Sequence, residues 1–287
     1  MTNDAARQPS SIELDRRAVR RRASQRSILL SIVSTIAFAG LVVVTLSLTP
    51  GWPRVRDTFF DLGSIPEAWP RIAEGFLLNL RVLGYSVVTV SVFGLLLALL
   101  RTVRGAVLFP VRALATVYTD VFRGTPLIVV LYLVGFGIPG LQGARGVIIP
   151  VEVLGTIAIT LTYSAYVSEV LRAGIESVHP SQRLAARSLG LSHAQSMRVI
   201  VVPQAIRKVT PALMNDFVSM QKDVGLISIL GAVDAIRAAG IEKYHVNNFT
   251  PYVLAGLLFV LLAIPTIRLT DWYTARLRQR EQMGAIV

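Results

Sequence analysis

The sequence contains no cysteine and few charged residues. Because none of the 287 positions is cysteine, disulfide scaffolds, thiolate metal sites and cysteine nucleophiles are excluded. Charged residues make up 16% of the chain, compared with about 25% in a typical soluble domain, whereas 53% of the residues are hydrophobic and the mean hydropathy is +0.59. This composition excludes a disordered chain and argues against a soluble globular protein.

Catalytic motifs are missing as well. A phosphate-binding loop of the form Gly-x-x-x-x-Gly-Lys-[Ser/Thr] needs a lysine after a glycine, and none of the three lysines, Lys208, Lys222 and Lys243, has that neighbour. The three histidines have no metal-ligand spacing, and the sequence offers no Ser/His/Asp arrangement and no catalytic carboxylate pair. We therefore predict a protein that is not an enzyme, has no metal site and binds no cofactor itself.

Hydrophobic runs long enough to cross a bilayer are abundant. The clearest is 28–49, whose 22 residues carry no charge and would span about 30 Å of hydrocarbon as a helix. A cleaved secretory signal is the alternative, because seven arginines precede the run and Ala37-Phe38-Ala39 resembles a cleavage site. The run continues well past Ala39, which favours an anchor. Five more segments can span: 82–100 with 76–81 before it, 111–138, 147–170, 211–232 and 251–267. We predict an all-α membrane protein with six transmembrane helices.

The positive charges are distributed unevenly about these segments. A net charge of +12 on a soluble protein would suggest nucleic acid. Here twenty lysines and arginines fall on one side of the predicted spans and six on the other, which predicts that both termini are cytoplasmic. We therefore expect no nucleic-acid partner, and a basic tail that interacts with anionic lipid. The predicted organisation is a basic cytoplasmic tail (1–27), a first transmembrane helix (28–49), an extracytoplasmic linker (50–75), a membrane core (76–272) with a cytoplasmic loop (172–208), and a cytoplasmic C-terminal tail (273–287).

The cytoplasmic loop contains a short amphipathic pattern over 182–191. Gly190 lies near its end, which predicts a short helix that a glycine stops. Pro203 then predicts where the chain turns back toward the membrane. By periodicity alone, this helix could lie on the membrane surface or dock on a partner. The apolar positions of the pattern are Leu184, Ala185, Leu189 and Leu191.

Four blocks of residues form a recognisable pattern in a fixed order. They are Phe122-Arg123-Gly124-Thr125-Pro126-Leu127; Ala165-Tyr166-Val167-Ser168-Glu169 with Arg172-Ala173-Gly174; Ala185, Ala186, Gly190 and Val202-Pro203; and Lys222-Asp223 leading to Leu230-Gly231. Over about 200 residues from Leu80 onward, they resemble the permease subunit of an ABC-type importer, in the branch that carries polar amino acids or opines. Two positions depart from that family's EAA loop pattern: Leu184 replaces the usual glutamate, and Ser181 replaces the usual glycine.

The resemblance implies a bacterial cytoplasmic membrane protein with a five-helix type I permease core, to which 28–49 adds one helix. It implies that the loop docks on an ATP-binding subunit, present in two copies, which holds ATP and magnesium. It also implies a second permease subunit, the same chain or a paralogue, and an extracytoplasmic amino-acid-binding protein. The implied ATPase-coupling residues are Gln182, Leu184, Ala185, Ala186, Leu189, Gly190 and Leu191.

Ionisable residues inside the predicted spans are candidates for the substrate path. Three unpaired charges near the middle of 211–232 would cost about 8 kcal/mol if they faced lipid. An amino acid presents an ammonium and a carboxylate group, so a path needs at least one acid and one donor. The alternative is that these groups pair inside the bundle, as Asp120 and Arg123 would at a spacing of three. Glu169 or Asp223 could accept the ammonium group, and Lys222 or a helix terminus could receive the carboxylate group. The full set of predicted path residues is Glu169, Lys222, Asp223, Asp216 and Arg123.

Two other classes of membrane protein compete with the ATP-driven importer. A proton-coupled secondary carrier would use Glu169, Asp216 and Asp223 as a relay, but it has no use for a coupling loop. A membrane anchor without transport function would not tolerate the insertion cost of the intramembrane charges. The sequence therefore favours ATP-driven import of polar amino acids, with opines, small peptides or other zwitterions as alternative substrates.

Overall fold

The computed structural model describes residues 11–102, 105–142 and 148–284, and every regular element within them is helical. Residues 1–10 of the predicted basic tail, Arg104 and Arg145 of two predicted loops, and residues 285–287 lie outside this part of the chain. The chain forms two compact units, Met1–Phe60 and Asp61–Val287. The prediction of an all-α membrane protein is confirmed.

The first unit holds one long helix and one short one. Helix α1 runs without interruption over Ser11–Leu48, and its stretch Gln25–Leu48 is long and apolar enough to cross a membrane. Its large apolar side chains, from Ile28 to Leu48, are exposed, as expected of a helix that has hydrocarbon as its solvent. After a turn, α2 covers Trp52–Phe59, with Pro53 in its first turn where a missing N–H costs nothing.

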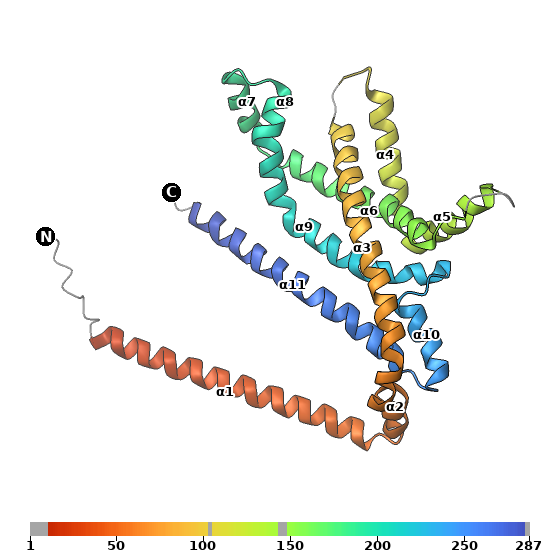
Figure 1. Cartoon of the computed structure of the whole chain (residues 1–287). Coiled ribbons are helices and arrows are strands. Elements are labelled where there is room, and N and C mark those ends of the chain that lie inside the picture. Colours follow the sequence, from red (N-terminus) through yellow and green to blue (C-terminus); the bar gives the residue numbers. More distant parts are fainter. Residues whose placement is uncertain (1–10, 103–104, 143–147, 285–287) are drawn as a thin grey trace. The chain divides into compact units, whose positions relative to one another are not determined.

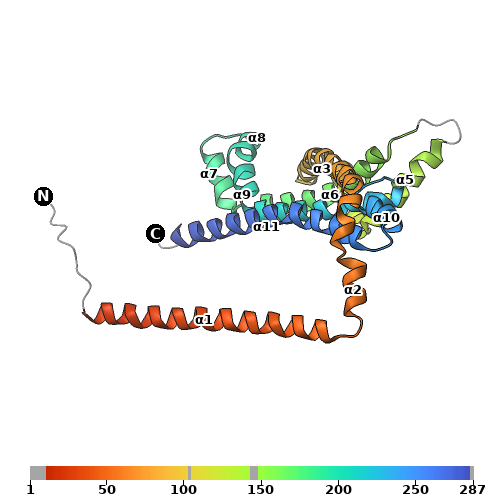
Figure 2. The ribbon, with the colours of Figure 1, turned by 60° about the horizontal axis from the view of Figure 1, so that its bottom comes forward.

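The second unit is a bundle around a central helix (Figures 1 and 2). Helix α6 packs against α3, α4, α5, α9 and η4. In Figure 1 the C-terminal end of α3 and the start of α4 lie at the same end of this unit as α7 and α8, and α10 lies at the opposite end. The helices are α3 (Ile65–Thr102), α4 (Phe109–Gly124), α5 (Leu127–Gln142), α6 (Val151–Glu176), α7 (Pro180–Ser188), α8 (His193–Ser196), α9 (Val202–Asp223), α10 (Ala235–His245) and α11 (Thr250–Gly284), with the 3-10 segments η1 (Leu62–Ser64) and η4 (Val224–Leu230) and the π-helical turn η3 (Met197–Val201).

Four helical stretches of the described residues can cross a membrane individually: Gln25–Leu48, a stretch within Trp52–Thr102, Val151–Glu176 and Thr250–Leu277. Two bent pairs also qualify when each pair is taken together, Phe109–Gly124 with Leu127–Leu141 and His193–Leu230 with Ala235–His245. The number of spans is therefore four, or up to six if each bent pair is one span. The predicted linker 50–75 is largely helical, because it contains α2, η1 and the start of α3.

One predicted segment is divided. The run 111–138 is not a single helix, since α4 and α5 meet at a bend of 108°. The break lies at Thr125, whose backbone is extended (φ −99°, ψ 128°). Proline disfavours the helical conformation of the residue before it and lacks an N–H for the helix. Pro126 therefore explains why an uninterrupted apolar run forms two helices.

The main core lies between α3, α5, α6 and η4. Val82, Leu131, Ile159 and Ile227, one from each of these elements, are fully buried there. Close approach depends on small residues: a Cβ atom at Gly155 would lie only 2.7 Å from Cγ2 of Ile227. Any side chain at Gly155 would therefore push η4 away from α6.

A buried polar cluster joins α3 to the start of α10. The side-chain amide of Asn79 donates to the backbone oxygen of Val224 (3.0 Å) and to Oδ2 of Asp234 (3.1 Å), and its oxygen accepts from the N–H of Ala235 (3.1 Å). Asp234 in turn caps α10, because its Oδ1 accepts from the N–H of Arg237 at 2.9 Å. Both Asn79 and Asp234 are fully buried, so this cluster fixes the angle at which α10 leaves η4.

Candidate functional site

The predicted coupling helix is α7, which begins within a short local hydrogen-bond network. Nδ1 of His179 accepts from the backbone N–H of Ser181 at 3.2 Å and thereby caps the helix. Pro180 occupies the first turn, where its fixed φ suits the helix and no N–H is required. Serine at position 181, where the family's pattern usually has glycine, adds a side-chain contact, because its Oγ lies 2.7 Å from Nδ1 of His179.

The end of α7 is a Schellman motif. Gly190 has a φ of +76°, a conformation that side chains rarely adopt. Its N–H bonds to the oxygen of Arg187 (2.9 Å), and the N–H of Leu191 bonds to the oxygen of Ala186 (3.1 Å). The structure thus has the short helix that the sequence predicts, and glycine stops it as expected.

A small apolar cluster lies beneath α7. It joins the end of α6 to the start of α9, and its buried members are Ile175, Val178, Val201 and Ala205. On α7 itself, Ala186 is fully buried, and the Arg183 guanidinium donates to the backbone oxygen of Ile175. These contacts hold the inner face of α7 against the rest of the second unit.

The outer face of α7 is exposed and partly apolar. Leu184 is 61% exposed and Leu189 is 80% exposed. Of the remaining predicted coupling residues, Gln182, Ala185 and Gly190 are exposed, Leu191 is half-buried and Ala186 is buried. A rigid projection with exposed leucines is suited to entering a groove on another protein.

The chain returns from α7 to the bundle through a rigid connection. Ser192 and Gln195 form a capping box at the start of α8. The π-helical turn η3 follows, and Pro203 lies in the first turn of α9, where the sequence predicts the return. Two side-chain contacts connect this return to the outgoing segment: Nε2 of Gln204 donates to Oε1 of Gln182 (3.0 Å), and Nζ of Lys208 donates to the backbone oxygen of Ser177 (3.0 Å).

Glu169 lies within a cluster of arginines. Its Oε2 accepts from Arg101 of α3 at 2.7 Å, its Oε1 accepts from Arg172 at 2.6 Å, and Arg123 of α4 lies 3.7 Å away. Arg172 also pairs with Glu176 at 2.6 Å. Both oxygens of Glu169 are therefore already engaged, and the group joins the ends of α3, α4 and α6.

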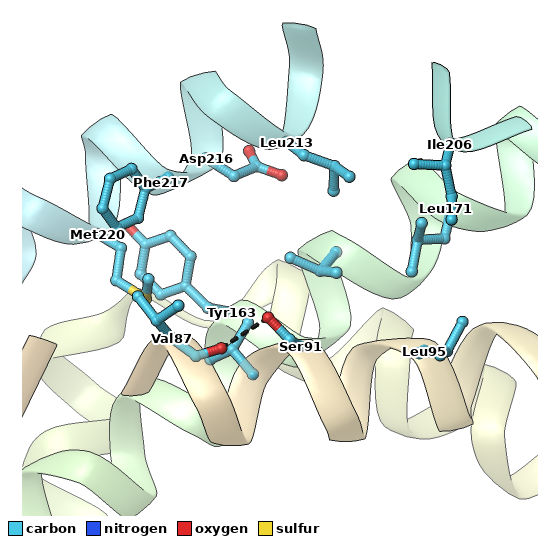
Figure 3. A pocket seen from close by; sticks show the side chains of 12 residues that line it. Val87, Ser91, Leu95, Tyr163, Leu171, Ile206, Leu213, Asp216, Phe217 and Met220 are labelled. Atoms are coloured by element: carbon cyan, nitrogen blue, oxygen red, sulfur yellow. Dashed lines mark hydrogen bonds between the residues drawn. The ribbon is translucent and has the colours of Figure 1, made fainter. Parts of the chain in front are cut away.

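Asp216 and Asp223 lie at two adjacent cavities. A cavity of about 340 Å³ between α3, α6 and α9 has Asp216 on one wall, with Ser91 of α3 and Tyr163 of α6 on others (Figure 3). A second cavity of about 280 Å³ is lined by Tyr163, Asp216 and Asp223 together with Thr125 and other residues. Both volumes are near the lower end of the range of about 300–1,000 Å³ for ligand pockets.

The two carboxylates differ in their partners. Asp223 accepts a hydrogen bond from the Tyr163 hydroxyl at 2.7 Å. Oδ2 of Asp216 is buried, and no group in the described part of the chain donates to it. A carboxylate oxygen buried without a donor is costly, so a cationic group entering the cavity would satisfy it.

The remaining predicted path residues are more exposed. Lys222 is exposed, and among the described residues its side chain makes no hydrogen bond or ion pair. Arg123 is electrostatically coupled to Asp216 and lies over the Tyr166 ring at 6.0 Å. The alternative pairing of Arg123 with Asp120 is absent from the ion pairs of the described chain, where Arg123 pairs with Glu169. Asp120 itself is exposed.

Sequence reasoning overlooked Tyr163, Arg101 and the Asn79–Asp234 pair. Tyr163 and Asn79 are polar residues in apolar runs, and polar residues inside membrane spans are typically functional or paired. That signal was available in the sequence. The partners of these residues were not, because Tyr163 is 60 positions from Asp223, and Arg101 is 68 positions from Glu169.

Relatives and a family were found for this sequence. Residues 91–279 match the family described as binding-protein-dependent transport system inner membrane component. The arginine transport system permease protein ArtQ of Bacillus subtilis is 32% identical over 204 residues, which cover 70% of this chain and 89% of the relative. The glutamate/aspartate import permease protein GltK of Escherichia coli O157:H7 is 30% identical over 222 residues, which cover 76% of this chain and 98% of the relative.

Solved structures agree with the family match. The crystal structure of an amino acid ABC transporter with histidines has a TM-score of 0.67 and 33% identity, and the match covers 75% of this chain and 98% of that one. An inward-facing structure of the MetNI methionine ABC transporter has a TM-score of 0.52 and 17% identity, and the match covers 71% of this chain and 96% of that one. At this identity the similarity supports the fold alone. The chain therefore belongs to the family of binding-protein-dependent transport system inner membrane components, which are permease subunits of ABC importers.

Proposed function

We propose that this chain is the membrane-spanning subunit of an ATP-driven importer of polar amino acids. The observation that carries this proposal is α7, a rigid helix with exposed Leu184 and Leu189 that is held between the end of α6 and the start of α9. A secondary carrier would not need such a projection. The substrate class is supported by the relatives, whose names specify arginine, glutamine, and glutamate or aspartate.

The proposed substrate path uses the two cavities at Tyr163. Asp216, whose buried Oδ2 has no donor among the described residues, would bind the ammonium group of an amino acid. Asp223 would contribute a second negative charge, oriented by the Tyr163 hydroxyl. Arg123, which interacts with Asp216, or Lys222 would receive the carboxylate group. We assign Glu169 a different role, because its two oxygens are occupied by arginines.

The proposed assembly contains further chains. Two ATP-binding subunits would dock on the coupling residues, Gln182, Leu184, Ala185, Ala186, Leu189, Gly190 and Leu191, and they would hold ATP and magnesium. A second permease subunit, the same chain or a paralogue, would complete the membrane pair. An extracytoplasmic binding protein would deliver the amino acid at the end of the bundle that holds α10.

The proposed orientation has both termini in the cytoplasm of a bacterial cell. It is supported by the twenty lysines and arginines that fall on one side of the predicted spans, against six on the other. The coupling segment belongs to the side that is rich in positive charge, as docking on a cytoplasmic ATPase requires. An extracytoplasmic α7 in a cysteine-accessibility experiment on cells would contradict the orientation and the coupling role together.

Uptake into sealed vesicles tests the proposed function. The chain is reconstituted with its ATP-binding subunit and binding protein, and uptake of labelled arginine, glutamine and glutamate is measured with ATP inside the vesicles or with a proton gradient alone. We expect uptake that requires internal ATP and the ATPase subunit. Uptake that persists without the ATPase and stops when the gradient is collapsed would identify a proton-coupled carrier instead. ATP-dependent uptake of an opine or a small peptide, but of no amino acid, would overturn the substrate class alone.

A further inference from the structure

A cavity of about 420 Å³ lies where the end of α3, the start of α4 and the end of α6 meet. It is separate from the two cavities assigned to the substrate, since it shares no lining residue with either of them. Arginines from three helices line it: Arg101 from α3, Arg112 from α4 and Arg172 from α6. One acidic residue, Glu176, lines it as well.

Positive charge is in excess at this cavity. Among the ion pairs of the described residues, Glu169 and Glu176 pair with Arg101, Arg123 and Arg172, and Arg112 also lines the cavity, so four arginines lie around two carboxylates. Helix α4 begins at Phe109, so the positive end of its dipole lies at the same wall. The cavity is therefore a favourable place for an anion.

Arg101, which lines this cavity, has a hydrogen-bond donor without an acceptor among the described residues. Its side chain is only 8% exposed, and a single nitrogen, Nη1, bonds to Glu169. Its Nε is buried, and no acceptor for it exists among the described residues. A buried guanidinium N–H without an acceptor is costly, and an anionic oxygen in the cavity would remove that cost.

The surroundings of the cavity are apolar. Phe109 and Val117 line it and are 58% exposed each, and Arg112 lies over the Phe109 ring at 5.5 Å. Near the cavity, α3 and α4 present further exposed apolar side chains: Leu96, Leu99, Val111, Leu114 and Val121. An occupant that matches this site has an anionic head and long apolar tails, which a free inorganic anion lacks.

From these observations we infer that the α3–α4–α6 cavity binds the headgroup of an anionic phospholipid. The headgroup phosphate accepts hydrogen bonds from Arg101 and Arg112, and the acyl chains follow the exposed apolar faces of α3 and α4. The bound lipid thereby bridges the end of α3 to the start of α4, close to the helix end that carries the coupling segment.

Lipid titration of the purified chain tests this inference. Native mass spectrometry measures the binding of phosphatidylglycerol and of phosphatidylcholine to the detergent-solubilised chain, with and without millimolar inorganic phosphate. We expect preferential binding of phosphatidylglycerol, and about tenfold weaker binding in Arg112→Gln, which removes one charge-assisted contact. Equal binding of the two lipids to the unmodified chain overturns the inference, and displacement of phosphatidylglycerol by inorganic phosphate assigns the cavity to a free anion rather than to a lipid.

Two further variants separate a binding role from a general effect of charge. Arg268→Gln removes an exposed arginine of α11 that does not line the cavity, and we expect phosphatidylglycerol binding to remain within twofold of the unmodified chain. Glu176→Gln removes the negative charge at the cavity, so we expect about threefold tighter binding, an effect that misfolding cannot produce. Equal weakening in Arg112→Gln and Arg268→Gln, or no tightening in Glu176→Gln, would contradict a specific headgroup site.

Discussion

Asn79 and Asp234 are separated by 155 positions in the sequence, yet their side chains bond to each other at 3.1 Å in a fully buried environment. Asn79 also satisfies the backbone of Val224 and Ala235, on either side of the bend between η4 and α10. This one side chain on α3 therefore fixes the change of direction between η4 and α10.

We expect Asn79→Ala to destabilise the protein by about 2–4 kcal/mol, because it leaves a buried carboxylate oxygen and two backbone groups without partners. The measurement is the thermal unfolding midpoint of the chain in detergent. Asn215→Ala on the exposed face of α9 is the matched control, because the Asn215 side chain is exposed and makes no hydrogen bond among the described residues. Equal unfolding midpoints for the two variants would contradict the role assigned to Asn79.

Gly190→Val tests the coupling segment. Valine at a φ of +76° is strained by about 1–3 kcal/mol, so the Schellman motif should open and the position of α7 should change. We expect the variant to insert and assemble, while ATP hydrolysis stimulated by substrate falls by about tenfold. Gly190→Asn is the control, because asparagine tolerates the left-handed conformation, and it should keep most of the stimulation. Normal coupled hydrolysis in the valine variant would remove the coupling role from this segment.

The exposed leucines of α7 give a binding prediction. If Leu184 and Leu189 enter a groove of the ATP-binding subunit, their replacement by alanine removes buried apolar area worth about 1–2 kcal/mol each. We expect each single variant to weaken association with that subunit by about tenfold, as measured by pull-down titration. Leu141→Ala, at an exposed position on α5, should leave association unchanged. Association that is insensitive to all three changes would place the docking surface elsewhere.

Asp216→Asn tests the substrate path. Loss of the negative charge at the 340 Å³ cavity should lower the kcat/KM of uptake by about tenfold, since a charge-assisted hydrogen bond contributes roughly 1.5–3 kcal/mol. Assembly with the partner subunits, measured by size-exclusion chromatography, should not change. Asp271→Asn on an exposed part of α11 serves as the control. If uptake and assembly decline together, Asp216 stabilises the bundle and does not bind the substrate.

The ion pair between Arg101 and Glu169 gives a prediction about stability. Arg101→Met removes one charge-assisted hydrogen bond to Glu169, worth about 1.5–3 kcal/mol, while Arg172 still binds Glu169, so the variant should have a lower unfolding midpoint. In the double variant Arg101→Met with Glu169→Leu we expect at least half of the loss to be recovered. A double variant no more stable than Arg101→Met alone would mean that Glu169 acts mainly through Arg172 and Arg123.

Much of the fold could be predicted from the sequence, because the solvent of a membrane protein imposes a simple rule. A long, predominantly apolar run must be helical in hydrocarbon, and this rule locates α1, α3, α6 and α11. It fails where a helix breaks without losing its apolar character. The bend at Thr125-Pro126 lies inside an apolar run, so hydrophobicity alone predicts one helix there. Pro126 is the residue in the sequence that indicates the break.

The candidate site could be predicted in part. Glycine and proline at fixed positions locate the end of α7 and the start of α9, because Gly190 and Pro203 act through local backbone geometry. The roles of the charged residues depend on long-range packing. Asp216 and Glu169 are both acids within predicted spans, yet one has a buried oxygen without a donor and the other is held by arginines. That difference is set by which helices pack against each acid, and no local pattern encodes it.

The apolar cluster under α7 has a mechanical consequence. Its buried residues come from both sides of the coupling segment: Ile175 and Val178 before α7, and Val201 and Ala205 after it. A force applied to the exposed leucines would therefore act on two helices at once. One is α6, in which Glu169, bound by arginines, lies two turns from the C-terminal end. The other is α9, which carries Asp216 and Asp223. If the proposed ATP-binding subunit moves α7, the two helices would slide past each other, and the hydrogen bond between Tyr163 of α6 and Asp223 of α9 would be strained first.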